Sequence, residues 1–480
     1  MDYEEPLKKI VKGAGIILIG IVLSKLITFL YRVVIARLGA EQYGLFSLGL
    51  ATLGIISTIA LLGFGTGVVR YISYYKGKND LARVKGTYYL TLKITVLTSL
   101  IFTILLFIFS DTLAIKFFHN PELIPVLKIM SLAIPSAVLS TILLSLLRSY
   151  HYAKQITYSK YIFENLAKLI FTLLFLSLGF KVFGAVFGYV LAIFGTLILS
   201  FYFVKRDILS KLKKIEPIYP STKELFFYSF PLLFNEAIIL VILWTDTFMI
   251  AYFLDIKYVG IYNAITPTAL MMHLFPFALA YFFLPILTEV HSQNNHATYS
   301  ILSKTITKWV FAFELMVLSL LILLSEEFLR FFFGREYLAE ELTIFNHEFF
   351  ISQVALTIIL FGFLINYTIT CPKNTLVIFK KTKIMAFNIS IAAVLNILLN
   401  LYLIPLHGII GAAIASSISF IIRAILNAIA AYKITKINIF SLKFIIASTP
   451  FSTASVNINE LPPRASNPAP TIFKAETVCF

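Results

Sequence analysis

Two cationic side chains lie inside the first apolar stretch of the sequence. Lys25 and Arg32 are seven residues apart, about two helical turns, so a helix would place them on one face. Ionisable groups within membrane segments mark functional sites. This pair predicts a basic wall that receives an anionic headgroup such as a phosphate, with Arg32 binding in a bidentate manner and Lys25 as a point charge. Alternatively, Arg32 extends to the membrane surface and Lys25 pairs with an acid elsewhere.

The seventh apolar stretch carries Asn235, Glu236 and Asp246 in place of cations. Asn235 and Asp246 are three helical turns apart and share one face. The three residues predict a gating or coupling site. Asp246 could pair with Arg32 across a cavity and close one side of it, or Glu236 or Asp246 could bind a proton or a cation. A permanent ion pair between the two halves of the chain is the structural alternative.

Four further charges lie in other apolar stretches. Glu314 and Arg423 stand alone and are possible cavity residues, although pairing or a position near a helix end would also explain them. Glu164 and Lys168 are spaced to satisfy each other on one helix face.

Membrane-spanning helices must position these residues. Of the 480 residues, 59% are hydrophobic and 13% are charged, which excludes a water-soluble enzyme and a disordered body. Because roughly 20 apolar residues cross a bilayer, we predict an all-α integral membrane protein with about twelve transmembrane helices. The eighth stretch contains three prolines and is expected to be bent or broken. The predicted spans are 13–36, 44–66, 87–109, 123–147, 159–180, 182–204, 226–252, 258–289, 307–329, 349–371, 384–405 and 408–432.

Lysine and arginine gather at the N-terminus and in the loops that follow even-numbered spans. By the positive-inside rule, the N-terminus and these loops are cytoplasmic in a multi-pass protein of the cell membrane. This topology accounts for most of the formal net charge of +16, so no nucleic acid partner is expected.

The chain contains an internal repeat. Residues 38–47 resemble residues 254–263, and Gly44 aligns with Gly260. The offset holds an even number of spans, so the repeat is parallel and predicts two six-helix lobes around a central cavity. The predicted regions are an N-terminal lobe (1–204), a cytoplasmic linker (205–224), a C-terminal lobe (225–449) and a disordered or aberrant tail (450–480), the last being either a regulatory segment or the product of a frameshift or truncation.

Two stretches resemble signatures of a known family. They are RVVIARLGAEQYGLFS at 32–47 and NILLNLYLIPLHGIIGAAIA at 396–415. Together with the repeat, they resemble the polysaccharide flippases of the multidrug/oligosaccharidyl-lipid/polysaccharide exporter superfamily. The resemblance implies two six-helix lobes, a central cavity, and movement of lipid-diphosphate-linked glycans from the cytoplasmic to the outer leaflet.

Enzyme motifs are missing from the sequence. It has no GxxxxGK[ST] or HExxH pattern, and its two cysteines, Cys371 and Cys479, form no CxxC metal site. No catalytic residue, metal or other cofactor is predicted. We expect a lipid-linked oligosaccharide flippase that works by alternating access, with the glycan, membrane lipids and a coupling cation or proton as partners. A cation-coupled multidrug antiporter is the alternative; a membrane glycosyltransferase or an assembly scaffold is less favoured.

Overall fold

A computed structural model describes residues 4–344 and 347–437. Contacts divide the chain into residues 1–439 and 440–480, and everything described below belongs to the first unit. The predicted tail, 450–480, lies outside the described residues.

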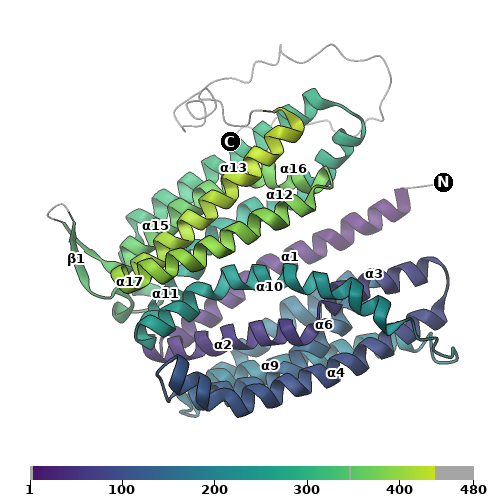
Figure 1. The fold of residues 1–480 in the computed structure, drawn as a ribbon, viewed down its shortest axis with the longest axis horizontal. Helices are drawn as coiled ribbons and strands as arrows, with labels where there is room; N and C mark the ends of the chain where they lie inside the picture. Colours follow the sequence, from purple (N-terminus) through teal and green to yellow (C-terminus); the bar gives the residue numbers. More distant parts are fainter. Residues whose placement is uncertain (1–3, 345–346, 438–480) are drawn as a thin grey trace. The chain divides into compact units, whose positions relative to one another are not determined.

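The first half of the chain is a series of helices (Figure 1). They are α1 (Glu4–Ala36), α2 (Ala40–Leu61), α3 (Phe64–Gly77), α4 (Leu81–Thr112), η1 (Leu113–Phe117), α5 (Leu123–Ser131), α6 (Ala133–Ser149), α7 (Ala153–Ile156), η2 (Thr157–Phe163), α8 (Glu164–Ser177), α9 (Lys181–Val204) and η3 (Lys205–Leu209).

The second half is also mainly helical, and its last part is drawn in green to yellow in Figure 1. It holds α10 (Thr222–Phe253), α11 (Ile256–Ala269), η4 (Leu270–His273), α12 (Leu274–Ser292), α13 (His296–Leu323), α14 (Ser325–Phe332), η5 (Arg335–Leu338), α15 (Ile351–Thr368), α16 (Thr370–Ile378) and α17 (Thr382–Thr435).

Nine helical segments in the described part of the chain are long and apolar enough to cross a membrane. Two more predicted spans, 159–180 and 258–289, fall on the helical runs η2–α8 and α11–η4–α12. The predicted break in the eighth span is present, because the 3₁₀ turn η4 separates α11 from α12. The last two predicted spans lie in α17, which bends at Gly408 with φ 57°, a conformation that favours glycine. The protein is therefore an all-α integral membrane protein.

Side-chain caps set several helix starts. Asp80 accepts a hydrogen bond from the backbone amide of Arg83 at 3.0 Å, and Asn295 does the same for Thr298 at 3.0 Å. These side chains satisfy amide groups that have no partner within the helix. They lie in loops predicted to be cytoplasmic, so they define where α4 and α13 begin outside the apolar core.

One element differs from the prediction. Between η5 and α15 the chain forms an antiparallel hairpin of β1 (Glu341–Ile344) and β2 (His347–Phe350), with Glu341 opposite Phe350. The predicted spans place residues 341–348 in a loop and begin the tenth span at residue 349, within β2. Strands of four residues are too short to leave a clear alternating pattern in the sequence.

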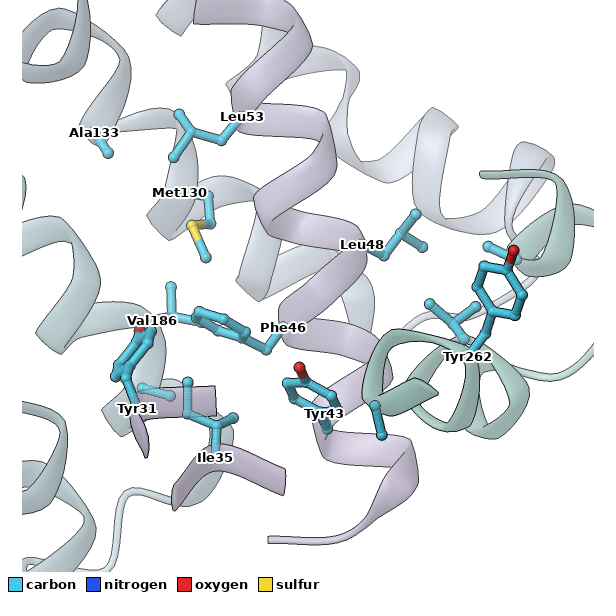
Figure 2. Packing of buried hydrophobic residues seen from close by; sticks show 14 of the residues in the cluster. Tyr31, Ile35, Tyr43, Phe46, Leu48, Leu53, Met130, Ala133, Val186 and Tyr262 are labelled. Atoms are coloured by element: carbon cyan, nitrogen blue, oxygen red, sulfur yellow. The ribbon is translucent and has the colours of Figure 1, made fainter. Parts of the chain in front are cut away.

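Helix α2 lies at the centre of the apolar core (Figure 2). Phe46 packs edge-on against Tyr31 of α1 and Tyr189 of α9, with ring centroids 5.9 and 6.1 Å apart. Leu53 points toward Met130 and Ala133, whereas Leu48 points toward the helix that carries Tyr262. Helix α2 also contacts α10 and α11, so it joins the two halves of the chain.

Helix α4 has an exposed apolar surface, in contrast to the buried helix α2. Leu97, Ile104 and Ile108 are 61%, 57% and 63% exposed. Apolar side chains of this size would be unfavourable in water but are suited to contact with lipid. The outer helices thus keep the polar residues that lie inside the fold away from the bilayer.

Helices α2 and α11 cross at a glycine junction, formed by Ala40, Gly44, Ile256 and Gly260. A Cβ atom at Gly44 would collide with the carbonyl oxygen of Ile256, and one at Gly260 would collide with that of Ala40. The two helices can approach this closely only because both positions lack a side chain. The hydroxyl of Tyr43 adds a hydrogen bond to the carbonyl of Asn263 at 3.1 Å.

Helix η5 is tied to the end of α1 beside this junction. The buried hydroxyl of Tyr337 donates to the carbonyl of Ala36 at 2.7 Å, and the guanidinium of Arg37 donates to the carbonyl of Phe332 at 3.0 Å. These bonds link residues about 300 positions apart.

Substitution Tyr337→Phe is expected to lower the free energy of unfolding by about 1 kcal/mol, because it removes one buried hydrogen bond and leaves the Ala36 carbonyl without this donor. Thermal unfolding in detergent would measure the loss. Tyr402→Phe is the matched control, since Tyr402 is 68% exposed and its change should be close to zero. Equal stability of the two variants would contradict a stabilising role for this bond.

Candidate functional site

The predicted basic face lies on α1. Lys25 is exposed and Arg32 is partly buried, and each lies within electrostatic range of the other. Within the described ranges, neither side chain forms an ion pair with a carboxylate. Both positive charges are therefore available to an anion.

A neighbouring face of α1 is held by α8. The Asn165 side chain donates to the Ser24 hydroxyl at 2.9 Å and accepts from the Thr28 hydroxyl at 3.0 Å. These two bonds fix the rotation of α1 about its axis. Since Lys25 and Arg32 follow Ser24 and Thr28 on the helix, the same bonds determine where the two cations point.

A buried ionic cluster adjoins this contact. Glu164 is 4% exposed and pairs with Lys168 at 2.7 Å, as the spacing predicts, and also with Lys160 at 2.8 Å. The Lys168 ammonium lies 4.5 Å from the ring centroid of Tyr189. One carboxylate thus compensates two ammonium groups, the buried one of Lys168 and the exposed one of Lys160.

Asp246 is the centre of a buried hydrogen-bond network. Its carboxylate accepts from the hydroxyls of Tyr262 and Ser416, both at 2.5 Å, and from the amides of Asn400 at 2.8 Å and Asn396 at 3.3 Å. The donors come from α11 and α17, and only 6% of Asp246 is exposed. Three helices of the second half therefore meet at one carboxylate.

The ion pair between Asp246 and Arg32 was one of the alternatives considered for Asp246. No ion pair joins Asp246 and Arg32 among the residues described, since neutral donors occupy the carboxylate. Glu236 instead accepts from the Thr66 hydroxyl of α3 at 3.0 Å. The side chain of Asn235 lies outside the described residues. Glu236 and Asp246 thus bind different helices.

The sequence analysis did not single out the donors around Asp246. Asn396 and Asn400 are four residues apart and share a helix face. Both lie in the second family-like stretch, and Ser416 follows directly after its end. Polar amides at helical spacing within an apolar stretch were the available signal. The sequence alone did not show that these amides contact Asp246.

The second half contains an open cavity of about 540 Å³, a size typical of small-molecule sites. Arg423 lines it and donates to the Asn366 side chain at 2.9 Å. The His273 ring lies 4.9 Å from that of Tyr367. The remaining lining residues are Ile239, Pro276, Phe277, Ala280, Leu284, Ile369, Lys373, Asn374, Met385, Ala386, Ile389, Ala424 and Asn427.

One residue of this cavity, His273, lies within electrostatic range of the basic face of α1. Lys25 of the first half and Lys373 and Arg423 of the second half all lie within electrostatic range of His273.

Glu314 of α13 was considered a possible cavity residue, but it does not line this cavity. Its side chain is fully buried, and in the described residues neither carboxyl oxygen has a hydrogen-bond partner. The nearby Tyr367 lies within electrostatic range of both Glu314 and Arg423. Glu314 therefore lies behind the wall of the cavity.

The sequence profile of a family described as "Polysaccharide biosynthesis protein" matches residues 10–291, more than half of the chain. The chain belongs to this family. The chain is similar in sequence to the "Putative O-antigen transporter" of Shigella flexneri. The two are 24% identical over 400 residues, which cover 81% of this chain and 89% of the relative.

Two solved structures have a fold similar to that of this chain. Lipid II flippase MurJ in an inward closed conformation superimposes with a TM-score of 0.69 at 17% identity, over 90% of this chain and 89% of MurJ. A multidrug resistance MATE family transporter in an inward-facing conformation gives a TM-score of 0.67 at 15% identity, over 86% and 94% of the two chains. At these identities the likeness concerns the fold.

Proposed function

We propose that this protein is a flippase that moves lipid-diphosphate-linked oligosaccharides from the cytoplasmic to the outer leaflet of the cell membrane. The observation that carries the proposal is the pair of cations on the apolar helix α1, Lys25 and Arg32, which form no ion pair within the described part of the chain. A diphosphate would bind these cations while the lipid tail stays in the bilayer. Family membership and the transporter relatives support this assignment.

Movement of the headgroup would follow from alternating access between two six-helix lobes, residues 1–204 and 225–449, joined by the linker 205–224. With a cytoplasmic N-terminus, the glycine junction lies near the outer surface. The close contact between α2 and α11 at this junction would then correspond to a state of the transporter that is closed to the outside. Outward opening would require α2 and α11 to separate, and substrate can drive that change only if it binds the two states differently.

Asp246 is the proposed coupling residue. A buried carboxylate is costly unless it is paired, hydrogen-bonded or bound to a cation, and a free oxygen lies beside this one: Asn400 Oδ1 is buried and, within the described part, accepts no hydrogen bond. Carboxylate and amide oxygens suit a hard cation, and the carboxylate could instead take up a proton. Glu236 accepts a hydrogen bond from Thr66 of α3. Through this bond, binding of the cation or proton at Asp246 would be transmitted to the first half of the chain.

A cation-coupled multidrug antiporter is the second candidate, because the buried Asp246 network and the MATE-like fold also suit that activity. The basic face of α1 argues against a cationic drug as the cargo. For both candidate functions, the flippase and the antiporter, we expect a transporter with no catalytic residue.

The proposal is tested by reconstitution in liposomes with a fluorescent lipid-diphosphate oligosaccharide. Lys25→Ala and Arg32→Ala should each slow transbilayer movement at least tenfold, because a hydrogen bond to a charged group contributes about 1.5–3 kcal/mol. Lys116→Ala, at an exposed position beyond α4, is the control and should transport normally. Unchanged rates in both α1 variants would move the site elsewhere, and no movement by the wild type under any ion gradient would favour the antiporter.

A further inference from the structure

The cavity in the second half carries positive charge of its own. Lys373 of α16 and Arg423 of α17 line it together with His273 of η4. Among the residues that the structure describes, the lining of the cavity contains no aspartate or glutamate, and neither Lys373 nor Arg423 forms an ion pair. Glu314, which does not line the cavity, lies within electrostatic range of Tyr367, which does.

Such charges are unfavourable at membrane depth unless an anion or water compensates them. Arg423 is held in place on one side by Asn366, so its remaining donors are oriented in advance and can grip a carboxylate in a bidentate manner. Lys373 is exposed within the cavity and supplies a second charge. The cavity is therefore arranged to receive an anionic oxygen group.

The rest of the lining suits a sugar. Asn374 and Asn427 offer amide groups to hydroxyls, and Phe277 and Ile389 offer apolar surfaces to the faces of a pyranose ring. The volume of about 540 Å³ leaves room for more than a small inorganic anion.

The proposed function already uses Lys25 and Arg32 for the diphosphate, whose two charges these two cations match. Lys373 and Arg423 remain unmatched. His273, which lines the cavity, lies within electrostatic range of Lys25, and the cavity would receive the sugars that follow the diphosphate. We propose that this cavity binds a carboxylate-bearing sugar, so that the protein selects acidic glycans; this rests on the proposed flippase function.

The test compares two fluorescent lipid-diphosphate disaccharides that differ only in a carboxylate or a CH₂OH group at one sugar carbon. Wild-type protein in liposomes should move the acidic substrate at least tenfold faster. Lys373→Met and Arg423→Gln should each bring the ratio of the two rates close to one. Lys433→Met is the matched control, since Lys433 is an exposed residue of α17 outside the cavity, and its ratio should equal that of the wild type.

The outcomes separate the possible sources of the anion. Equal rates for the two substrates in the wild type would overturn the proposal. So would an equal loss of both substrates in the Lys373 and Arg423 variants, because the cavity would then bind the shared diphosphate. If the neutral substrate moves and the acidic one has no advantage, the flippase function stands and only the selection of acidic glycans fails.

A binding measurement keeps the proposal testable if neither substrate moves, a result that would contradict the flippase function. The free acidic disaccharide should raise the unfolding temperature of the purified protein in detergent, whereas the neutral disaccharide should not. Arg423→Gln should abolish that shift while eluting as a folded protein in gel filtration. Identical shifts with both sugars would overturn the proposal independently of transport.

Discussion

Replacing Asp246 with alanine is expected to lower the free energy of unfolding by about 2–6 kcal/mol. The Tyr262 and Ser416 hydroxyls both donate to this carboxylate at 2.5 Å, and each would lose its acceptor inside the protein. A buried donor left unsatisfied costs about 1–3 kcal/mol. Asn400 would also lose its bond to Asp246 at 2.8 Å, although it keeps one to Asn396 at 3.2 Å.

Chemical unfolding in detergent measures this loss. Asp111→Ala is the matched control, because the Asp111 side chain is 54% exposed and forms a surface ion pair with Lys128 at 2.9 Å, worth about 0–1 kcal/mol. Asp246→Asn keeps the size and one acceptor oxygen, so it should fold better than Asp246→Ala but transport without any dependence on the coupling ion. An Asp246→Asn variant whose transport still responds to the ion gradient would rule out the coupling role.

Gly260→Ala is expected to have the second large effect. The added methyl group would enter the space of the Ala40 carbonyl oxygen, and a backbone atom cannot move aside as a flexible side chain can. Overpacking of this kind costs about 1–3 kcal/mol or more. The strain is relieved when α2 and α11 separate, so the variant should favour the state that is open to the outside.

Labelling by a membrane-impermeant maleimide would detect that shift. With Cys371 and Cys479 replaced, Leu48→Cys supplies a reporter, because Leu48 is fully buried and points toward α11 in Figure 2. Labelling should rise severalfold when Gly260→Ala is added. Gly77→Ala is the control, since a Cβ at Gly77 meets no atom within 4 Å. Equal labelling with either alanine would mean that the glycine junction does not hold the outer side closed.

Hydropathy was sufficient to predict the elements of this fold. Every predicted span falls largely on helix, including the broken segment at η4. These features depend on local chemistry, namely the length of apolar runs and the restricted backbone of proline. The hairpin of β1 and β2 was missed because four-residue strands carry too little pattern.

The candidate site was less accessible from the sequence. The charged residues in the helices could be identified one by one, but their partners depend on how each helix is rotated and packed. Asp246 meets neutral donors from α11 and α17 rather than Arg32. Lys373 and His273 were not singled out, because nothing in a single sequence places them beside Arg423 in one cavity.

The glycine junction is reciprocal. A Cβ at Gly44 meets the carbonyl of Ile256, and a Cβ at Gly260 meets the carbonyl of Ala40, so each segment uses the same residue positions toward the other. Isologous interfaces of symmetric homodimers have this pattern. The junction therefore has the form of a contact between two subunits that now share one polypeptide. A covalent connection gives the halves a high effective concentration, so their mutual contacts can be weak enough to break and re-form in each transport cycle without dissociation.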